Sequence, residues 1–567
     1  MKNILVLQNA RIGDMLQATP MLRGLKETYH GCHVTMLVNR LFGELELEDG
    51  LVDEVVQFDQ NGLYELLQND TMNLVEKYDH IKGFVAQFQT RTYDLILNLP
   101  SDANNHLLST LLSKHGGEVR GGVFTADRAL VLKHPTMFLF YTMSEIREFN
   151  RFNLVDLLTL CAGVRPDERR LHMARTAEGE AFADRFLAAH SVGDGDFLVA
   201  LQPGASEERK RWRPDRFAEL ADALKERMGA RVIICGSSAE LPLGQEVIRR
   251  AKHSVIDAVG KTSLSGLASL LSRCALLVTN DTGTMHMATA VGTRVIDLST
   301  GPVYFRETGP YAEGSFVVQG DIDCFPCHFT AVCHHLSCRE LITVPMVARL
   351  VELIKQGLPP SALNPRDFST VRLYASRFND VGRIEFLPVF RYALSDAEFM
   401  SFVYTHMWEV IHGLRRHPMA ASDLLSEIGQ YYDVSPATRL REYCASMLRP
   451  FRELSACLDE AIQRLQRVQQ LCHHPTEAAL AMSLCSEITA VLERVIILGR
   501  VHSVLKPLTI HLRLLIDSQE EGALHEVAAE YESAYRSIAD QSLFMTRSLE
   551  RLEEELAKPG CLTAATV

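Results

Sequence analysis

A polar tetrapeptide between two apolar segments is the strongest candidate for chemistry in this chain. The apolar run 274–278 is typical of a buried strand, and Asn280-Asp281-Thr282-Gly283 follows it almost directly. A helix rich in small residues is predicted to begin at this elbow. Because a helix N-terminus offers unpaired N–H groups and partial positive charge, the elbow suits a phosphate or another anion. The alternative is an ordinary helix N-terminus, capped by the side chain of Asp281 or Thr282.

Similar polar loops follow other predicted strands. They contain Gly13-Asp14 after 4–7, Gly204 after 197–201, Gly236-Ser237 after 231–235 and Thr300-Gly301 after 294–298. The alternation of strand and helix in both halves predicts parallel sheets covered by helices on both faces. Ligands of such sheets bind beyond the carboxyl ends of the strands. We therefore expect these loops to converge on one cleft, with Asp14 and Asp281 on facing walls.

The predicted fold class is α/β, with two Rossmann-like doubly wound domains and a mostly α-helical extension. The N-terminal domain is expected to span 1–175 and the second domain 190–357, because a polar, proline-containing stretch separates them. Residues 361–567 form the extension, with a hairpin over 371–389 and a disordered tail after Lys558. Helices are expected over 15–29 and, in the extension, over 396–415, 421–430, 435–471, 475–500, 503–517 and 520–556.

Composition narrows the function classes. The 567 residues are 47% hydrophobic and 23% charged, and the formal net charge of −13 argues against a nucleic-acid binder, which needs a basic face. No apolar run approaches the roughly 18–20 residues that span a bilayer, and the start of the chain does not resemble a signal peptide. We expect a cytoplasmic protein, with peripheral contact at the inner membrane left open. In that compartment its 13 cysteines are expected to be thiols or metal ligands.

With these loops in place, residues 1–357 resemble the heptosyltransferase family of glycosyltransferases, family 9. The motifs that carry the resemblance are Arg11-Ile12-Gly13-Asp14 with Ala18-Thr19-Pro20, Gln202-Pro203-Gly204-Ala205 with Lys210-Arg211-Trp212, Gly236-Ser237-Ser238-Ala239-Glu240, Asn280-Asp281-Thr282-Gly283-Thr284-Met285-His286 and Thr308-Gly309-Pro310-Tyr311. The resemblance implies the GT-B architecture, in which two Rossmann-like domains face a cleft. It also implies transfer of heptose from ADP-heptose to a lipopolysaccharide core or another cell-surface glycan, with inversion and without a catalytic cofactor.

Asp14 and Lys210 are the candidate catalytic residues. An inverting transfer needs a base for the proton of the acceptor hydroxyl, and the resemblance places the family's base at Asp14. The alternative is a capping residue for the helix that follows. Lys210 lies in the basic run 208–213, where Arg209, Arg211 and Arg213 are alternatives for the same role, and a fixed cation there can stabilise the departing diphosphate. The alternative for Lys210 is a solvated basic turn.

The donor-binding residues are expected around the same loops. Glu240 follows a strand and a Gly-Ser-Ser turn, where a carboxylate can accept both ribose hydroxyls, and a helix cap is the alternative. His286 lies on the helix after the elbow, where a buried, hydrogen-bonded histidine is the alternative. The full set of predicted donor-binding residues is Gly13, Gly204, Ser206, Glu240, Asp281, Thr282, Gly283 and His286.

A dense cysteine cluster lies outside these motifs. Cys324, Cys327, Cys333 and Cys338 fall within fifteen residues and suit a tetrahedral site for zinc or iron. The resemblance adds that protein-glycosylating relatives hold iron with similar cysteines. The role expected of such a metal is structural, and reduced thiols without metal are the alternative.

Three functions are compatible with the sequence. The first is an inverting glycosyltransferase that uses a nucleotide-sugar donor and a glycan or lipid acceptor. The second is a protein O-heptosyltransferase related to the autotransporter heptosyltransferases. The third is a non-catalytic GT-B scaffold. The helical extension is expected to recognise the acceptor, to form a homo-oligomer or only to stabilise the chain.

Overall fold

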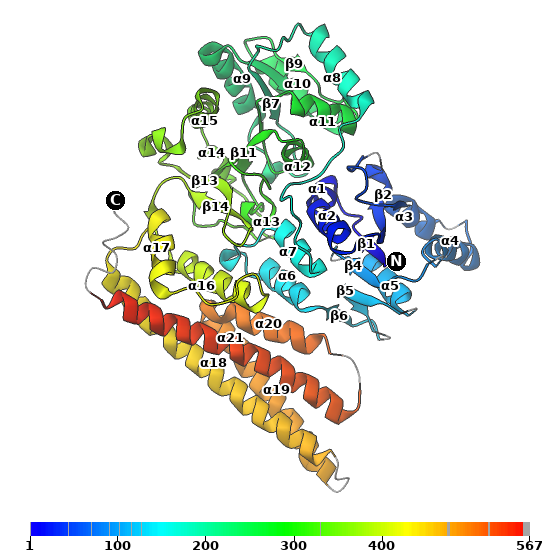
Figure 1. Ribbon diagram of the computed structural model, residues 1–567, viewed down its shortest axis with the longest axis vertical. Helices are drawn as coiled ribbons and strands as arrows, with labels where there is room; N and C mark the ends of the chain where they lie inside the picture. Colours follow the sequence, from blue (N-terminus) through cyan, green and yellow to red (C-terminus); the bar gives the residue numbers. More distant parts are fainter. Residues whose placement is uncertain are drawn as a thin grey trace. The chain divides into compact units, whose positions relative to one another are not determined.

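The computed structural model describes residues 2–43, 45–69, 71–89, 91–100, 102–114, 116–125, 127–328, 330–472, 477–519 and 522–558. The chain divides into two compact units (Figure 1). The first consists of Met1–Pro100, His115–Glu118 and Phe152–Phe390, and the second of Ser101–Lys114, Val119–Arg151 and Arg391–Val567. The tail for which disorder is predicted lies outside the described residues.

The first half of the first unit is built on a parallel sheet with the strand order β3-β2-β1-β4. Its strands are β1 Asn3–Leu7, β2 His33–Asn39, β3 Glu54–Phe58 and β4 Leu95–Asn98. Its helices are α1 Ile12–Gln17, α2 Thr19–Thr28, α3 Gln60–Gln68, α4 Leu74–Ala86 and α7 Leu154–Ala162. β1 is central because Ile4 to Leu7 are all apolar and fully buried.

The first predicted helix begins three residues early and is divided in two. α1 already starts at Ile12, and Ala18 separates it from α2. Pro20 explains the break, since it has no N–H to donate to the carbonyl of Leu16 and fits only a first turn. The hydroxyl of Thr19 donates to that carbonyl instead, at 2.6 Å. The early start places Asp14 inside the first turn of α1.

The second half of the first unit has the sheet order β14-β13-β12-β11-β10-β7-β8-β9. The strands are β7 Leu198–Gln202, β8 Arg231–Ile234, β9 Ile256–Asp257, β10 Leu276–Thr279, β11 Arg294–Ser299, β12 Phe316–Gly320, β13 Val371–Phe378 and β14 Ile384–Pro388. The helices are α8 Ala177–Ala189, α9 Pro214–Met228, α10 Leu241–Arg250, α11 Leu264–Ser272, α12 Gly283–Ala290, α13 Phe305–Thr308, α14 Ser337–Glu340 and α15 Val344–Gln356. The six neighbouring strands β12-β11-β10-β7-β8-β9 of this sheet have the Rossmann strand order. The strand order reverses between β7 and β10, which is the switch point.

The predicted hairpin over 371–389 forms as β13 and β14, which pair antiparallel. It does not belong to the helical extension, where the sequence placed it. β13 also pairs with β12, so the hairpin continues the second sheet. Its alternating apolar residues fit either location, and the free edge of β12 decides between them.

The second unit is mainly helical, as predicted. Its long helices are α16 Asp396–Ile411, α17 Ala421–Tyr431, α18 Ala437–Leu471, α19 Ala478–Val501, α20 Lys506–Asp517 and α21 Leu524–Leu556. It also contains the helices α5 Ala103–Ser113 and α6 Pro135–Glu145. Two short strand pairs belong to it as well. β5 Glu118–Phe124 pairs with β6 Leu130–Lys133, and β15 Tyr392–Ala393 pairs with β16 Tyr432–Asp433. The segment 119–151 joins this unit because Phe138 stacks on His511 and the N–H of Leu132 donates to Ser518 Oγ at 3.2 Å. Across the described residues, no helix is long and apolar enough to cross a membrane.

Candidate active site

A pocket of about 520 Å³ lies inside the first unit, where loops from both Rossmann-like halves meet. Asp14 and Asp281 both line it, so the sequence placed these two aspartates correctly in one cleft. The other predicted residues that line it are Gly13, Ser206, Lys210, Glu240, Thr282, Gly283 and His286, and Gly204 lies beside Glu240. The pocket is also lined by residues to which the sequence gave no individual role, namely Arg11, Gln17, Gln202, Thr262, Ser263 and Thr308.

The start of α1 and the start of α12 touch at the pocket. A Cβ atom at Gly13 would lie only 2.8 Å from His286 Cδ2, so a larger residue there would push the helices apart. Gln17 Nε2 and His286 Nε2 are 3.4 Å apart and buried. Burial lowers the pKa of His286 to about 4, which keeps its ring neutral. Gly13 is therefore needed for close approach, and His286 is a buried, neutral neighbour of α1.

Asp14 is a half-buried carboxylate in the first turn of α1. Its Oδ2 accepts a hydrogen bond from the N–H of Arg11 at 3.1 Å. Desolvation raises the pKa of Asp14 above its usual range, while the Arg11 N–H and the charges of Arg11 and Lys210 act in the opposite direction. The capping alternative is thus partly realised, but Arg11 is the N-cap residue and Asp14 still faces the pocket.

Lys210 connects the two acidic walls. Burial raises the pKa of Asp281 to about 6, and the charge of Asp14 adds to this rise. The charge of Lys210 opposes the rise, as does the hydroxyl of Thr308, which donates to Asp281 Oδ2 at 3.4 Å. The pocket therefore holds one ammonium group within electrostatic reach of two carboxyl groups.

The elbow before α12 leaves its helix N-terminus without a side-chain cap. Thr282 is the N-cap residue but makes no capping hydrogen bond. Its hydroxyl instead lies 3.3 Å from the hydroxyl of Thr279. Asp281 does not cap the helix either, so the capping alternative for this elbow is wrong. The N–H groups of the first turn are left to face the pocket, as an anion site requires.

Glu240 is held in place by three groups. Oε2 accepts from the N–H and the hydroxyl of Ser237, at 2.7 and 2.8 Å, and Gln202 Nε2 lies 3.3 Å from both carboxylate oxygens. Gly204 makes this position possible, because a Cβ atom there would lie 1.7 Å from Glu240 Oε1. The glycine of the Gln-Pro-Gly motif thus provides the space for this carboxylate.

Asn280 fixes the loop that carries Lys210. Its Nδ2 donates to the carbonyls of Pro203 and Gly204, both at 3.1 Å, and its Oδ1 accepts from the N–H of Trp212 at 2.8 Å. The buried Trp212 ring in turn donates from Nε1 to the carbonyl of Ile342 at 3.0 Å. The sequence showed Asn280 only as part of a polar elbow, because its three partners lie about 70 residues away.

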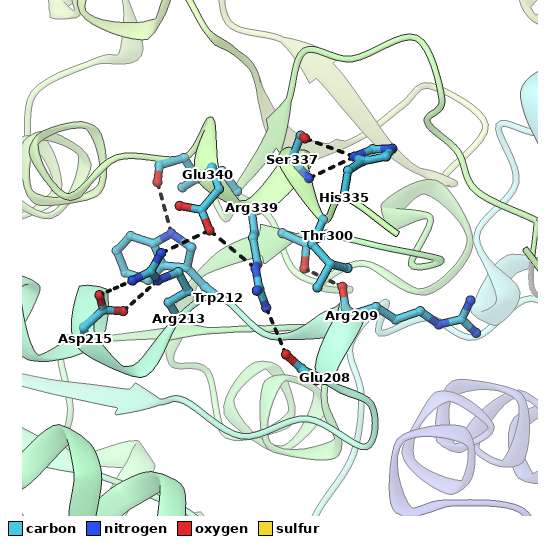
Figure 2. Close-up of polar contacts among 12 residues, drawn as sticks. Glu208, Arg209, Trp212, Arg213, Asp215, Thr300, His335, Ser337, Arg339 and Glu340 are labelled. Atoms are coloured by element: carbon cyan, nitrogen blue, oxygen red, sulfur yellow. Dashed lines mark hydrogen bonds and ion pairs between the residues drawn. The ribbon is translucent and has the colours of Figure 1, made fainter. Parts of the chain in front are cut away.

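The segment that contains the cysteine cluster supports the same loop, as Figure 2 shows. Arg213 donates to Asp215 at 2.6 Å and reaches Glu340 at 3.5 Å. Arg339 lies 3.7 Å from Glu208. Thr300 Oγ1 donates to the carbonyl of Arg209 at 3.4 Å, and Arg209 Nη1 donates to the carbonyl of Ala331 at 2.6 Å. Arg209, which precedes Lys210 in the chain, is thereby tied down, and Arg211, which follows it, donates from Nε to the carbonyl of Ala205 at 2.8 Å.

The four cysteines remain a predicted metal site. Burial and the charges of the Cys324, Cys338 and Cys333 thiols raise the pKa of Cys327 to about 11. The N–H of Leu336 donates to Cys333 Sγ at 3.4 Å and lowers the pKa of that thiol. Within the described ranges, no set of three or more histidine, cysteine or acidic side chains has an arrangement that would hold a metal.

A buried acid behind the pocket was not anticipated. Asp297 on β11 is fully buried and lies beside Thr279 in the sheet. Burial and the charge of Asp281 raise the pKa of Asp297 well above its usual range. An aspartate inside the apolar run 295–298 was the signal that could have revealed it.

Two Rossmann-like halves around one polar, phosphate-compatible cleft define the GT-B class of glycosyltransferases. Residues 83–334 match the model of glycosyltransferase family 9 (heptosyltransferase). The matched segment includes the Lys210 loop and the start of α12, and the protein is a glycosyltransferase.

Curated relatives cover the same region. The chain is 25% identical over 305 residues to lipopolysaccharide heptosyltransferase 3 of Escherichia coli, which covers 52% of this chain and 82% of that protein. It is 23% identical over 328 residues to lipooligosaccharide heptosyltransferase 2 of Haemophilus influenzae, covering 56% and 88%. A solved family 9 glycosyltransferase from Veillonella parvula aligns with a TM-score of 0.49 at 22% identity, covering 63% of this chain and 97% of that one.

Replacement of Gly204 by alanine is expected to weaken binding of the nucleotide-sugar donor by about tenfold to a hundredfold. The new Cβ atom would occupy the position of Glu240 Oε1 and displace this carboxylate. The measurement is the donor Kd by calorimetry. Gly193→Ala is the matched control, because a Cβ atom there meets open space. An unchanged Kd in the Gly204 variant would show that Glu240 does not contact the donor.

Because the described side chains have no arrangement that holds a metal, the cysteine prediction requires the segment 324–338 to rearrange around about one zinc or iron ion per chain. Elemental analysis of the purified protein measures this content, and Cys324→Ser with Cys338→Ser is expected to abolish it. Cys161→Ser is the control, because Cys161 is buried on α7, outside the cluster. Wild-type protein with no more metal than its buffer would contradict the prediction.

Proposed function

We propose that the protein transfers heptose, with inversion, from ADP-heptose to a hydroxyl group of a lipopolysaccharide core or related cell-surface glycan. The observation that carries this proposal is the shared pocket of Asp14, Lys210 and the uncapped start of α12. The two relatives described above are both heptosyltransferases, which supports the choice of sugar.

Asp14 is the proposed base. As the acceptor oxygen attacks the anomeric carbon, its proton passes to the Asp14 carboxylate and the bond from that carbon to the diphosphate breaks. The raised pKa of Asp14 favours this role, since a carboxylate with ordinary pKa is a weak base near neutrality. The Arg11 N–H holds Oδ2, which orients the carboxylate toward the pocket.

Lys210 and the α12 N-terminus are the proposed site of the leaving diphosphate. Negative charge grows on the diphosphate as the sugar bond breaks, and a fixed ammonium group and oriented N–H groups stabilise it. Arg11 adds a guanidinium group from the opposite half, and its Nη1 donates to Ser206 Oγ at 3.3 Å. Glu240 is the proposed acceptor for the ribose hydroxyls. The four-cysteine segment has a supporting role, through the hydrogen bond from Arg209 of the Lys210 loop to the carbonyl of Ala331.

Asp14→Asn is expected to lower kcat by roughly 10²–10⁴-fold without weakening donor binding. The amide oxygen can still accept the Arg11 N–H, so α1 keeps its cap. The measurement is transfer from ADP-heptose to isolated lipopolysaccharide core. ADP-glucose is the comparison donor, and a protein is the comparison acceptor. If wild type transfers sugar only to the protein acceptor, the acceptor is a protein and not the proposed glycan. Full activity of the variant would remove Asp14 from the mechanism.

Lys210→Met is expected to lower kcat by about 10²–10³-fold and to move the acid limb of the pH–rate profile to higher pH. The direction follows from the charge of Lys210, which lowers the pKa of both Asp14 and Asp281. Without that charge a higher pH is needed to ionise the base. Lys210→Arg retains the cation and should keep the limb in place. If the acid limb does not move in Lys210→Met, the charge of Lys210 does not influence the pKa of the base.

A further inference from the structure

The segment 308–311, which we call the closing segment, connects the pocket with α7. At one end Thr308 lines the pocket, and its hydroxyl donates to Asp281 Oδ2 at 3.4 Å. At the other end the buried Tyr311 donates from its hydroxyl to Asp156 Oδ1 at 2.9 Å. Asp156 belongs to α7, in the first half of this unit. A short stretch of backbone thus lies between an acid of the candidate active site and an acid of the opposite half.

The carboxyl group of Asp156 holds two elements at once. Besides Tyr311, it binds β14, since its Oδ2 accepts from the N–H of Ile384 at 3.1 Å. Asp156 is 7% exposed and Tyr311 is 3% exposed, so these hydrogen bonds are made away from water. A buried acceptor that loses its donor keeps the full cost of its desolvation, so each of these bonds resists opening. β14 lies outside the residues 83–334 that match the family model.

Two guanidinium groups act on the same carboxyl group. Burial raises the pKa of Asp156 to about 7, and the charges of Arg383 and Arg169 act in the opposite direction. Arg383 Cζ lies 4.4 Å from the centroid of the Phe152 ring. A Cβ atom at Gly382 would lie 1.0 Å from Arg169 Nη1, so glycine leaves the space that this guanidinium group occupies. The turn between β13 and β14 is therefore fitted closely to the first half around Asp156.

The closing segment has little room to move between its two ends. A Cβ atom at Gly309 would lie 2.3 Å from the carbonyl oxygen of Phe305 and 2.7 Å from Phe386 Cζ on β14. The ring of Tyr311 packs edge-on against Phe378 of β13, with the centroids 5.3 Å apart. Close-packed interiors transmit displacements. A shift of Tyr311 is therefore passed on to Thr308.

We propose that Asp156 is a positioning residue for the donor site. It holds Tyr311, and through the closing segment it keeps the Thr308 hydroxyl directed at Asp281. Asp156 acts from behind the pocket and touches neither the donor nor the reacting atoms. The proposal rests on the proposed function in one respect, the contact of Asp281 with the donor. The alternative is a purely structural residue that joins the two halves, and the two roles differ in their effect on donor and acceptor.

Tyr311→Phe is the first test, because it removes one hydroxyl group and keeps the ring that packs on Phe378. We expect the KM for ADP-heptose to rise about tenfold, while kcat and the KM for the lipopolysaccharide core acceptor change less than about twofold. Thr308→Val should have the same effect, and the double variant should be no worse than either single one. The matched control is Tyr64→Phe on α3, whose side chain is 65% exposed.

Asp156→Asn is the second test. Its amide oxygen can accept one of the two hydrogen bonds, and its amide nitrogen cannot accept the other, so the same rise in donor KM is expected. Hydrogen exchange measures the closing segment without any donor. The N–H of Gly309 donates to the carbonyl of Phe305 at 2.7 Å. We expect its exchange to be roughly tenfold faster in Tyr311→Phe than in wild type, and unchanged in Tyr64→Phe.

The outcomes separate the positioning role from a structural one. An unchanged donor KM in Tyr311→Phe, equal rises in donor and acceptor KM, or additive effects in the double variant would each overturn the proposal. If wild type does not use ADP-heptose, the proposed function fails, and hydrogen exchange then decides. Equal exchange in wild type and Tyr311→Phe would show that the hydroxyl does not hold the closing segment.

Discussion

The site depends on a close contact between the starts of two helices from different halves of the first unit. Gly13 on α1 lies against His286 on α12, and Ile12 approaches Gly283. The positive ends of both helices thus meet at one pocket, together with Arg11 and Lys210. Side chains with a Cβ atom at position 13 would break this contact. A single glycine therefore determines whether the two halves form one site.

The second requirement is that the polar loops are rigid before a ligand arrives. Asn280 binds the backbone of the Gln-Pro-Gly loop and of Trp212 together, so the elbow and the Lys210 loop form one hydrogen-bonded assembly. Ser237 and Gln202 hold Glu240 in the space that Gly204 leaves. Groups fixed in this way need little reorganisation during a reaction, which is the property that makes electrostatic stabilisation effective.

The sequence was informative where local pattern determines structure. Each apolar run that ends in a Gly-containing polar loop is a strand, and parallel strands necessarily bring their carboxyl ends to one side. This is why Asp14 and Asp281, far apart in the chain, could be placed in one pocket. The long helices of the extension followed equally well from their periodicity.

The pattern of apolar and polar residues was insufficient where the position of a segment depends on contacts with residues far away in the chain. The hairpin 371–389 alternates apolar and polar residues whether it stands alone or extends a sheet, and only β12 provides the edge that it joins. The segment 119–151 is likewise drawn to the helical unit by contacts such as Phe138 with His511. The roles of Arg11 and Asn280 depend on partners about 70 to 195 residues away, which no spacing rule reveals.

The charges of the pocket suggest how donor binding and base strength are linked in the proposed reaction. In the empty pocket the charge of Lys210 lowers the pKa of Asp14 and of Asp281. A bound diphosphate would share that ammonium group and would add negative charge of its own beside both carboxylates. Both changes disfavour an ionised carboxylate, so the pKa of Asp14 rises when the donor is bound. A base of higher pKa accepts the acceptor's proton more readily, so the pocket is most basic when a donor is in place to react.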